Sequence, residues 1–260
     1  MQFIPVPQEA SAWPAGSAER AVGAMAGVVA CMGSPGFAQD ALAHINRWLP
    51  ASWWSVFRLF DHAPPCMPLS GSYRAADNTG QSWQAYRTGL YQHDQTFLAA
   101  HEHIPSAGHL LLHWHALEIP PAHREPIYTR HGLRERLSIV SRDATGALLA
   151  INLYRHENLP ALTDDEIDCA GRAAGLLTAC VRRHLEFASP APAAAESVLG
   201  GLPRREREVC ERLLKAWTYD GIAVDLGVSP GTVKTYRNRA FDRLGIHHRN
   251  ELFALVAGIG

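Results

Sequence analysis

The stretch "YDGIAVDLGVSPGTVKTYRNRAF", residues 219–241, holds the signals for two short helices joined by a tight turn. Apolar residues at helical spacing give the first helix a buried face, and Gly227 suits the left-handed residue that ends it. Ser229 and Pro230 are favoured at a helix start, because the serine hydroxyl caps the first turn and the N–H that proline lacks would have no helical partner there. The stretch therefore predicts a helix-turn-helix, the minimal unit that docks in the major groove of DNA.

The second of these helices carries polar residues suited to nucleic acid along one side. Lys234, Thr235 and Asn238 fall at i, i+1 and i+4, which places them on one outward stripe. Lysine can pair with guanine and asparagine with adenine, so we expect this stripe to face bases. A further set suits phosphates, which supply affinity without sequence information: Thr232, Arg237 and Arg239. The alternative is a helical packing module that makes no contact with DNA.

The helix-turn-helix lies within a segment of four predicted helices, at about 203–216, 218–226, 230–244 and 248–257. The last helix is more apolar than a free surface helix needs to be, through Leu252, Phe253, Leu255 and Val256. These side chains either close the core of the module or form a contact between two copies of it. The sequence leaves both interpretations open.

The segment from Leu202 to Val256 closely resembles the LuxR-type helix-turn-helix domain. The resemblance implies a transcription regulator that binds DNA as a dimer through its last helix and reads bases with the outward stripe. Trp217 and Tyr236 depart from the family pattern, and we interpret both as packing positions. The residues that carry the resemblance are Leu202, Arg205, Glu206, Glu208, Val209, Ile222, Ala223, Leu226, Gly227, Ser229, Thr232, Val233, Lys234, Leu244, Gly245, Arg249, Glu251 and Leu252.

Charge is unevenly shared along the 260 residues, although the net charge is only −1. From Gly200 onward ten Lys and Arg residues stand against seven Asp and Glu residues, whereas residues 1–199 hold 14 against 18. Both lysines of the chain, Lys215 and Lys234, lie in the basic part. Such asymmetry indicates a nucleic-acid module joined to a domain of another kind.

The stretch "ASPAPAAAES", residues 188–197, marks the boundary between the two parts. Its prolines interrupt a helix, and its small side chains cannot build a core. We therefore predict a first domain over residues 1–187, a Pro/Ala linker over 188–198 and a DNA-binding domain over 199–260.

The first domain mixes helix and strand signals, and most strands are joined by hairpins or return helices. This order predicts an α+β fold, in which an α-β-α sandwich with a mostly antiparallel sheet precedes an all-α four-helix module. Thr163 and Glu166 form a capping box at the start of the last long helix. The expected helices are 17–32, 36–49, 80–101 (as one or two), 120–131 and the one after Thr163, and the expected strands are 52–60, 66–73, 109–117 and the hairpin "LRERLSIVSRD"–"GALLAINLYR".

This order of elements resembles the autoinducer-binding domain of quorum-sensing LuxR proteins, a sandwich similar to GAF and PAS sensors. Three segments carry the resemblance: "WQAYRTGLYQHDQTF", "LLHWHAL" and "YTRHGLRERLSIVSRDATGALLAINL". It implies that this domain binds a small signal molecule and that the ligand contacts come from Trp83, Tyr86, Asp94 and Trp114.

Departures from that family bear on the ligand. Asp94 is followed by Gln95 where the family has proline, and Glu135 or Arg136 replaces the family's second glycine. These differences count against an acyl-homoserine lactone but leave a small-molecule sensor standing. Two simpler interpretations also stay open: Asp94 can cap the following helix, and Trp114 can be an ordinary core residue.

Eight of the 14 histidines fall between His93 and His131, and the pairs 101/103 and 113/115 have a spacing that can bind a metal. A solvated histidine-rich surface explains them more simply, so we predict no metal site and no cofactor, with a metal- or haem-responsive regulator as an alternative. The chain also lacks the G-x-S-x-G, glycine-rich phosphate-loop and H-E-x-x-H motifs, which predicts that it is not an enzyme.

The five cysteines are odd in number and widely spaced, as in cytoplasmic proteins with reduced thiols. No apolar run is long enough to span a membrane, and the N-terminus lacks the basic region of a signal peptide, so we expect a cytoplasmic protein. Together the observations predict a sequence-specific transcriptional regulator whose first domain senses a small molecule and controls dimeric binding to double-stranded DNA. The alternative within the same class is a dimeric regulator that needs no ligand.

Overall fold

The computed structural model divides the chain into two compact units, one of Met1–Asp61 with Met67–His184 and one built on Leu185–Gly260. Nearly all of the predicted linker lies outside the residues that the structure describes, so the domain boundaries stay a prediction. The described residues are 2–6, 17–60, 65–104, 108–143, 146–188, 198–215 and 217–257.

The first unit is built on a six-stranded sheet in the order β1-β4-β5-β6-β2-β3. The pairings of β1 with β4, β4 with β5, β5 with β6 and β6 with β2 are all antiparallel, which confirms the predicted sheet. The strands are β1 Gln2–Pro5, β2 Trp53–Leu59, β3 Cys66–Ser72, β4 His109–His115, β5 Leu133–Arg142 and β6 Leu148–His156. Of these strands, only β1 is not predicted from the sequence. Its four residues carry too little pattern of their own, and they form a strand by pairing with β4.

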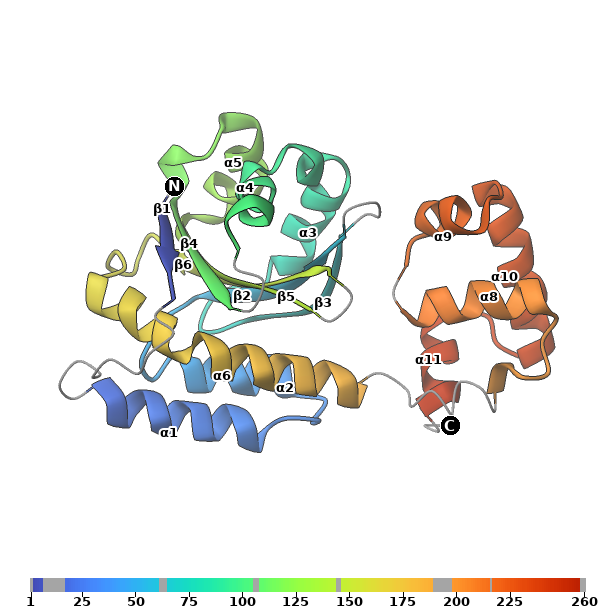
Figure 1. Cartoon of the computed structure of the whole chain (residues 1–260), viewed down its shortest axis with the longest axis horizontal. Coiled ribbons are helices and arrows are strands. Elements are labelled where there is room, and N and C mark those ends of the chain that lie inside the picture. The colour runs from blue at the N-terminus through green and yellow to red at the C-terminus, as the bar shows by residue number, and fades with distance from the viewer. Residues whose placement is uncertain are drawn as a thin grey trace. The chain divides into compact units, whose positions relative to one another are not determined.

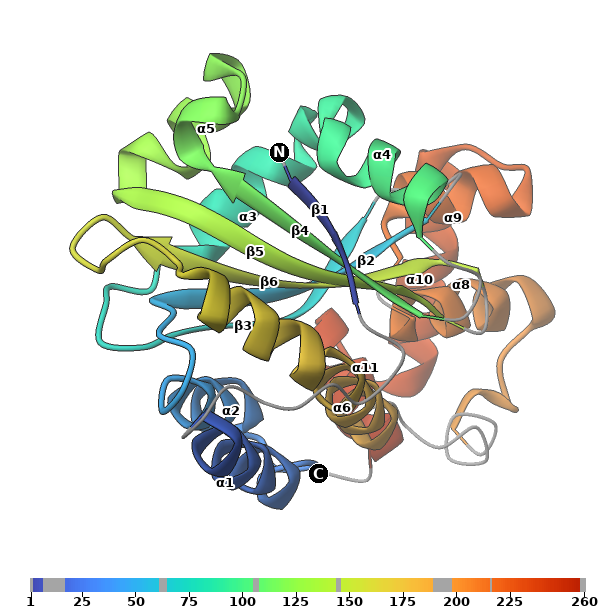
Figure 2. The same cartoon turned by 60° about the vertical axis from the view of Figure 1, so that its left-hand side comes forward.

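Helices cover both faces of the sheet, as Figures 1 and 2 show, so the predicted α-β-α sandwich is confirmed. One layer consists of α3 Thr79–Arg87, α4 Gln95–His103 and α5 Pro121–Ile127, with the short 3₁₀ turns η1 Leu90–His93, η2 Ala116–Glu118 and η3 Thr129–His131. The opposite layer consists of α1 Ser17–Ala30, α2 Phe37–Ile45 and α6 Asp164–Ala188.

Adjacent tryptophans on β2 show how the strand alternates between the two layers. The Trp53 indole N–H donates to the Ala76 carbonyl oxygen at 2.9 Å, and Trp53 belongs to the core under α3, α4 and α5. The Trp54 indole N–H donates at the same distance to Ala38 on α2. Successive side chains of a strand point to opposite faces, so both apolar layers are anchored by one short stretch of sequence.

The long helix α6 begins as its capping box predicts. The Glu166 backbone N–H donates to Thr163 Oγ1 at 3.2 Å, and the Thr163 N–H donates back to Glu166 Oε2 at 2.9 Å. The predicted apolar face of the helix is buried in the sandwich: Ile167, Ala170, Ala174, Leu177 and Val181.

The second unit contains the four expected helices, α8 Arg204–Leu214, α9 Tyr219–Leu226, α10 Pro230–Leu244 and α11 Arg249–Ala257. Gly227 and Gly245 end α9 and α10 in the left-handed conformation, with φ of 65° and 67°. Ser229 caps α10, because its Oγ accepts from the Thr232 backbone N–H at 3.1 Å. Trp217 and Tyr236 pack against the core of this unit, as the sequence predicted.

Two further expectations concern the chain as a whole. All five cysteines are among the described residues, and none of them forms a disulfide. Among the described residues, every helix is too short or too polar to cross a membrane.

Candidate DNA interface and ligand cavity

The helix α10 presents two contrasting sides. Val233 and Ala240 are fully buried in the core of the second unit. Lys234, Asn238 and Arg239 are exposed. The sequence prediction of an outward polar stripe therefore agrees with the exposure along this helix.

The predicted base-reading residues differ in how free their polar groups are. Thr235 is exposed, but its hydroxyl donates to the Gly231 carbonyl oxygen one turn earlier, at 3.1 Å. Thr232 is half-buried and hydrogen-bonded to the Ser229 hydroxyl at 2.8 Å, so it belongs to the helix cap. The side chains of Lys234 and Asn238 form no hydrogen bond or ion pair with another residue in the described part of the chain. These two therefore have the greatest freedom to pair with bases.

Arg237 makes contacts within the domain that the sequence did not predict. Its guanidinium carbon is 5.5 Å from the centre of the Tyr219 ring and 5.4 Å from the centre of the Phe241 ring. The residue is half-buried, and its Nε is enclosed by protein. A guanidinium between two aromatic rings makes cation–π contacts that hold α9 against α10. Of the three predicted phosphate contacts, Arg239 is the exposed cation.

In the first unit, a cavity lies between the sheet and the layer of α3 and α5. Its walls include Trp53, Phe57, Trp83, Tyr86 and Tyr154, and we call it the aromatic cavity. The Phe57 ring centre is 5.1 Å from that of Trp83 and 5.2 Å from that of Tyr86. The cavity volume is about 20 Å³, which is room for about one water molecule.

A second cavity, of about 10 Å³, is lined by Asp94, Thr96, Trp114, His123 and Arg136, and we call it the polar cavity. His123 and Arg136 also line the aromatic cavity, so the two spaces share a wall. The four ligand contacts predicted from the sequence thus divide between adjoining cavities, two in each.

The position of Asp94 supports the simpler of its two interpretations, a helix cap, while its role as a ligand contact stays a prediction. Its Oδ1 accepts from the Thr96 backbone N–H at 3.0 Å, so the residue caps α4. Its Oδ2 is buried and forms no close hydrogen bond with a described residue. Trp114 is both a core residue, 6% exposed, and part of the wall of the polar cavity.

Five buried polar atoms around the two cavities have no close hydrogen-bond partner among the described residues, although the Tyr86 hydroxyl and the Asp94 carboxylate interact with each other. None of their side chains is more than 6% exposed. Nearly all buried polar groups in folded proteins have a partner, so this region holds unused hydrogen-bonding capacity. The atoms are Tyr86 Oη, Asp94 Oδ2, Trp114 Nε1, Tyr128 Oη and Arg136 Nε.

The electrostatics keep this region polar at neutral pH. Burial raises the pKa of the Tyr86 hydroxyl well above its ordinary value, and the nearby Asp94 carboxylate raises it further. Burial acts to lower the pKa of Arg136, but Tyr128 and Asp94 beside it raise the pKa above its ordinary value. Burial also lowers the pKa of His123. Arg136 is therefore a charged donor and Tyr86 a neutral hydroxyl.

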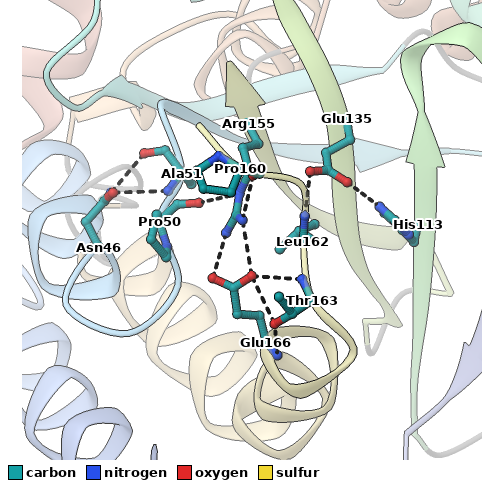
Figure 3. Close-up of polar contacts among 10 residues, drawn as sticks. All are labelled: Asn46, Pro50, Ala51, His113, Glu135, Arg155, Pro160, Leu162, Thr163 and Glu166. Atoms are coloured by element: carbon teal, nitrogen blue, oxygen red, sulfur yellow. Dashed lines mark hydrogen bonds and ion pairs between the residues drawn. The ribbon is translucent and has the colours of Figure 1, made fainter. Parts of the chain in front are cut away.

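A buried polar cluster lies on the opposite face of the sheet, at the start of α6 (Figure 3). Glu135 is 1% exposed; its Oε1 accepts from the Leu162 N–H at 2.8 Å, and its Oε2 lies 2.7 Å from His113 Nε2. Arg155 donates to the Pro50 and Pro160 carbonyl oxygens and to both carboxylate oxygens of Glu166. We call this cluster the α6 clamp, because it ties the residues around the start of α6 to β4, β5 and β6.

The sequence alone does not predict the α6 clamp, because it favours a solvated surface position for His113. The available signal was alternation along the strands. His113 precedes the cavity residue Trp114, and Glu135 precedes the cavity residue Arg136, so both must face the opposite layer. Among the described residues there is no group of three or more His, Cys, Asp or Glu side chains that could hold a metal ion. The side chain of His101, part of one predicted pair, lies outside the described residues.

Comparison with known proteins identifies the second unit. Residues 201–256 match the family described as bacterial regulatory proteins, luxR family. Residues 201–256 form a luxR-family helix-turn-helix domain, as the sequence resemblance implied. The matched residues contain α8, α9 and α10, so the outward stripe of Lys234 and Asn238 belongs to a DNA-binding domain.

Three further proteins are similar to this chain over different shares of its length. An HTH-type transcriptional regulator encoded 3′ of exeN in Aeromonas salmonicida is 28% identical over 155 residues, which is 53% of this chain and 79% of that protein. The transcriptional regulatory protein FixJ of Azorhizobium caulinodans is 40% identical over 63 residues, 24% of this chain and 30% of that protein. The crystal structure of the VqsR LBD domain from Pseudomonas aeruginosa covers 66% of this chain and 98% of its own, with 14% identity and a TM-score of 0.47.

Proposed function

We propose that this regulator binds a specific DNA sequence through α10 and that its first unit, within residues 1–187, binds a small molecule in the aromatic and polar cavities. The observation that carries the second part is the group of five buried polar atoms without close partners. A protein loses stability by burying such groups unpaired, whereas a bound molecule would satisfy them. Trp83 and Tyr86 contribute an apolar wall next to these polar groups, the combination found in small-molecule sites.

The cavity volumes add a condition to this proposal. At about 20 and 10 Å³, the two spaces together hold little more than one or two water molecules. A signal molecule of ordinary size therefore requires α3 and α4 to move outward from the sheet. Trp83 is only partly buried on α3, so it is the side chain best placed to swing away. Ligand binding then shifts the population from this closed arrangement toward an open one.

The α6 clamp supplies a route from the cavities to the DNA-binding domain. Arg136 lines both cavities, and its neighbour Glu135 holds Leu162 just before α6. A ligand that displaces Arg136 would also displace Glu135 and so disturb the start of α6. The other end of that helix, at Ala188, is where the predicted linker over 188–198 begins.

The regulator acts as a homodimer in this proposal, since one α10 reads only a half-site and two give specificity and affinity. In α11, Leu252 and Val256 are buried in the core of its own unit, as one of the two interpretations of this helix expected. Leu255 remains 39% exposed on the same helix, and Phe253 is partly exposed. These two side chains are the surface we assign to the dimer contact. The oligomeric state of Leu255→Ser by sedimentation tests it, with a monomer as the expected result.

The test of ligand binding is mass spectrometry of the full chain purified from its native host, with a parallel metal and absorbance scan. Release of a stoichiometric organic molecule on denaturation is the expected result. If no molecule is released and no host extract changes DNA binding, the sensor hypothesis is wrong and a dimeric regulator that needs no ligand explains the protein instead. A stoichiometric metal or haem would replace it with a metal- or haem-responsive regulator.

A further inference from the structure

A groove on the first unit is large enough for a small molecule as it stands. It is bordered by the residues at the start of β2, the connection from β3 to α3, the η3 turn and the residues that follow β6. Its volume is about 910 Å³, within the range of about 300–1,000 Å³ that small-molecule sites have in proteins. Of its described residues only Trp53 also lines the aromatic cavity, and none lines the polar cavity. The groove is therefore distinct from the two cavities, and we call it the basic groove.

Positive charge predominates in the basic groove. Arg74 and Arg130 line it, both are exposed, and neither forms an ion pair within the described parts of the chain. The acidic residue of the lining is Glu157, which likewise makes no ion pair there. The nearby Asp77 is engaged at the start of α3, where its Oδ1 accepts from the Thr79 backbone N–H at 3.1 Å and from the Thr79 hydroxyl at 2.6 Å. Two guanidinium groups therefore stand against one carboxylate in the lining of the groove.

The backbone at Arg74 is strained. Its φ is 51°, and among the described residues Arg74 is the one non-glycine residue in the left-handed region. This region is unfavourable for a residue with a long side chain, and such strain is concentrated at functional sites that must hold one side chain in place. The Arg74 guanidinium carbon lies 5.2 Å from the centre of the neighbouring Tyr73 ring, which supports the side chain at the groove. The strain is explained if the groove requires a cation at this position.

Several polar groups of the basic groove can donate hydrogen bonds and have no partner. The side-chain amides of Asn78 and Asn158 form no hydrogen bond in the described parts of the chain. His131 Nε2 is buried and also lacks a partner among the described residues. Burial and the adjacent Arg130 lower the pKa of His131, so its imidazole is neutral at neutral pH and can donate through one nitrogen. A molecule rich in acceptor oxygens would satisfy these groups together with the two arginines.

Charge and hydrogen bonding decide the class of that molecule. Residues 1–199 hold 14 Lys and Arg residues against 18 Asp and Glu residues, so this part of the chain would repel an extended polyanion such as nucleic acid. A small anion meets only the local excess of positive charge. A carboxylate has two oxygens and is filled by one guanidinium, whereas the three terminal oxygens of a phosphate group can accept from two. The pair of arginines therefore favours a phosphate ester over a carboxylic acid.

We propose that the basic groove binds a small organic phosphate. Arg74 and Arg130 donate to the phosphate oxygens, and the Asn78 and Asn158 amides bond to the rest of the molecule. This site is separate from the cavities of the proposed sensor function and does not depend on it. The proposal predicts that phosphate binding requires both arginines of the groove and none of the cations of the DNA-binding domain.

Isothermal titration calorimetry of the full chain with inorganic pyrophosphate tests the proposal, because this probe presents phosphate oxygens alone. Sodium chloride at equal ionic strength is the blank. Arg74→Gln and Arg130→Gln should each weaken pyrophosphate binding at least about tenfold, since each removes a charge-assisted contact. Two controls should leave the affinity unchanged: Arg87→Gln, at an exposed position of α3 outside the groove, and Arg239→Gln, at the exposed cation of α10.

Arg74→Gly separates a functional from a structural role of the strained residue. Glycine adopts the left-handed conformation freely, so this variant should lose affinity for pyrophosphate but melt at or above the temperature of the natural protein. Retained binding together with a lower melting temperature would assign the strain to the fold and overturn the proposal.

The remaining outcomes are equally decisive. Absence of pyrophosphate binding overturns the proposal, as does an affinity that survives in both Arg74→Gln and Arg130→Gln. A loss confined to Arg239→Gln would place the phosphate on the DNA-binding domain and would overturn it too. An organic molecule extracted from the native host with the protein bears on the sensor function, which is judged separately from this titration.

Discussion

Glu135 and Arg136 are consecutive on β5 and serve opposite faces of the same sheet. Arg136 lines both cavities under α3, α4 and α5, whereas Glu135 accepts a hydrogen bond from the Leu162 N–H on the side of α6. A shift in the pairing of β5 with β6 falls between Leu133 and Glu135, where Arg134 is the extra residue. The irregularity in β5 therefore lies next to the peptide bond that joins Glu135 of the α6 clamp to Arg136, which lines both cavities.

The stability of the first unit should depend on Glu135. In Glu135→Ala the half-buried Leu162 N–H and His113 both lose their partner, which should lower the free energy of unfolding by about 1–3 kcal/mol. Urea denaturation followed by fluorescence measures the change. Glu102→Ala, on the exposed side of α4, is the matched control and should change stability little. Equal effects of both substitutions would remove the α6 clamp as a stabilising feature.

The same carboxylate should give a defined acid dependence. Burial acts to raise the pKa of Glu135, but the hydrogen bonds from His113 and the Leu162 N–H lower it below its ordinary value of 4.5. Since the pKa is lower in the folded state, this contribution is fully present above 4.5 and is lost as the pH falls below it toward the folded pKa. Glu135→Gln keeps an acceptor for Leu162 without titrating, so its urea midpoint should fall less steeply than that of the natural protein below pH 4.5. Parallel curves for the two proteins would contradict the assignment.

The sequence was sufficient where local pattern alone decides structure. The alternation at Trp53 and Trp54, the capping box at Thr163 and the left-handed Gly227 each depend on a few neighbouring residues. The sequence does not predict an element whose structure depends on pairing with a distant segment. The strand β1 exists because Gln2–Pro5 pairs with β4, about a hundred residues later.

The candidate sites divide in the same way. Asp94 and Trp114 line the polar cavity, and their contact with a ligand, which the family resemblance implied, stays a prediction. The hydrogen bond between His113 and Glu135 needs the register of β4 against β5, which a single sequence does not give. The place of Arg237 depends on which ring of α9 packs against α10, and helical spacing alone cannot specify that.

Asn238 should contribute to sequence specificity. It is exposed on α10 and bonded to no described residue, so Asn238→Ala should weaken binding to the specific site by about 1–3 kcal/mol and change binding to random DNA little. Thr235→Ala is the comparison on the same stripe. Its hydroxyl is already engaged with Gly231, so the loss should be smaller. Fluorescence anisotropy on both DNAs measures these differences, and an equal loss on both DNAs for Asn238→Ala would exclude base reading by this residue.

Substitutions of Arg237 and Arg239, two residues apart on α10, should have different effects. Arg239 is exposed, so Arg239→Ala should weaken specific and random DNA alike and reduce the slope of log affinity against log salt by about 1. Arg237 stands between Tyr219 and Phe241, so Arg237→Ala should lower the melting temperature of the domain by weakening the contact of α9 with α10. Its salt slope, measured below the melting transition, should stay near that of the natural protein. A reduced slope with unchanged melting would instead return Arg237 to the phosphate contacts predicted from the sequence.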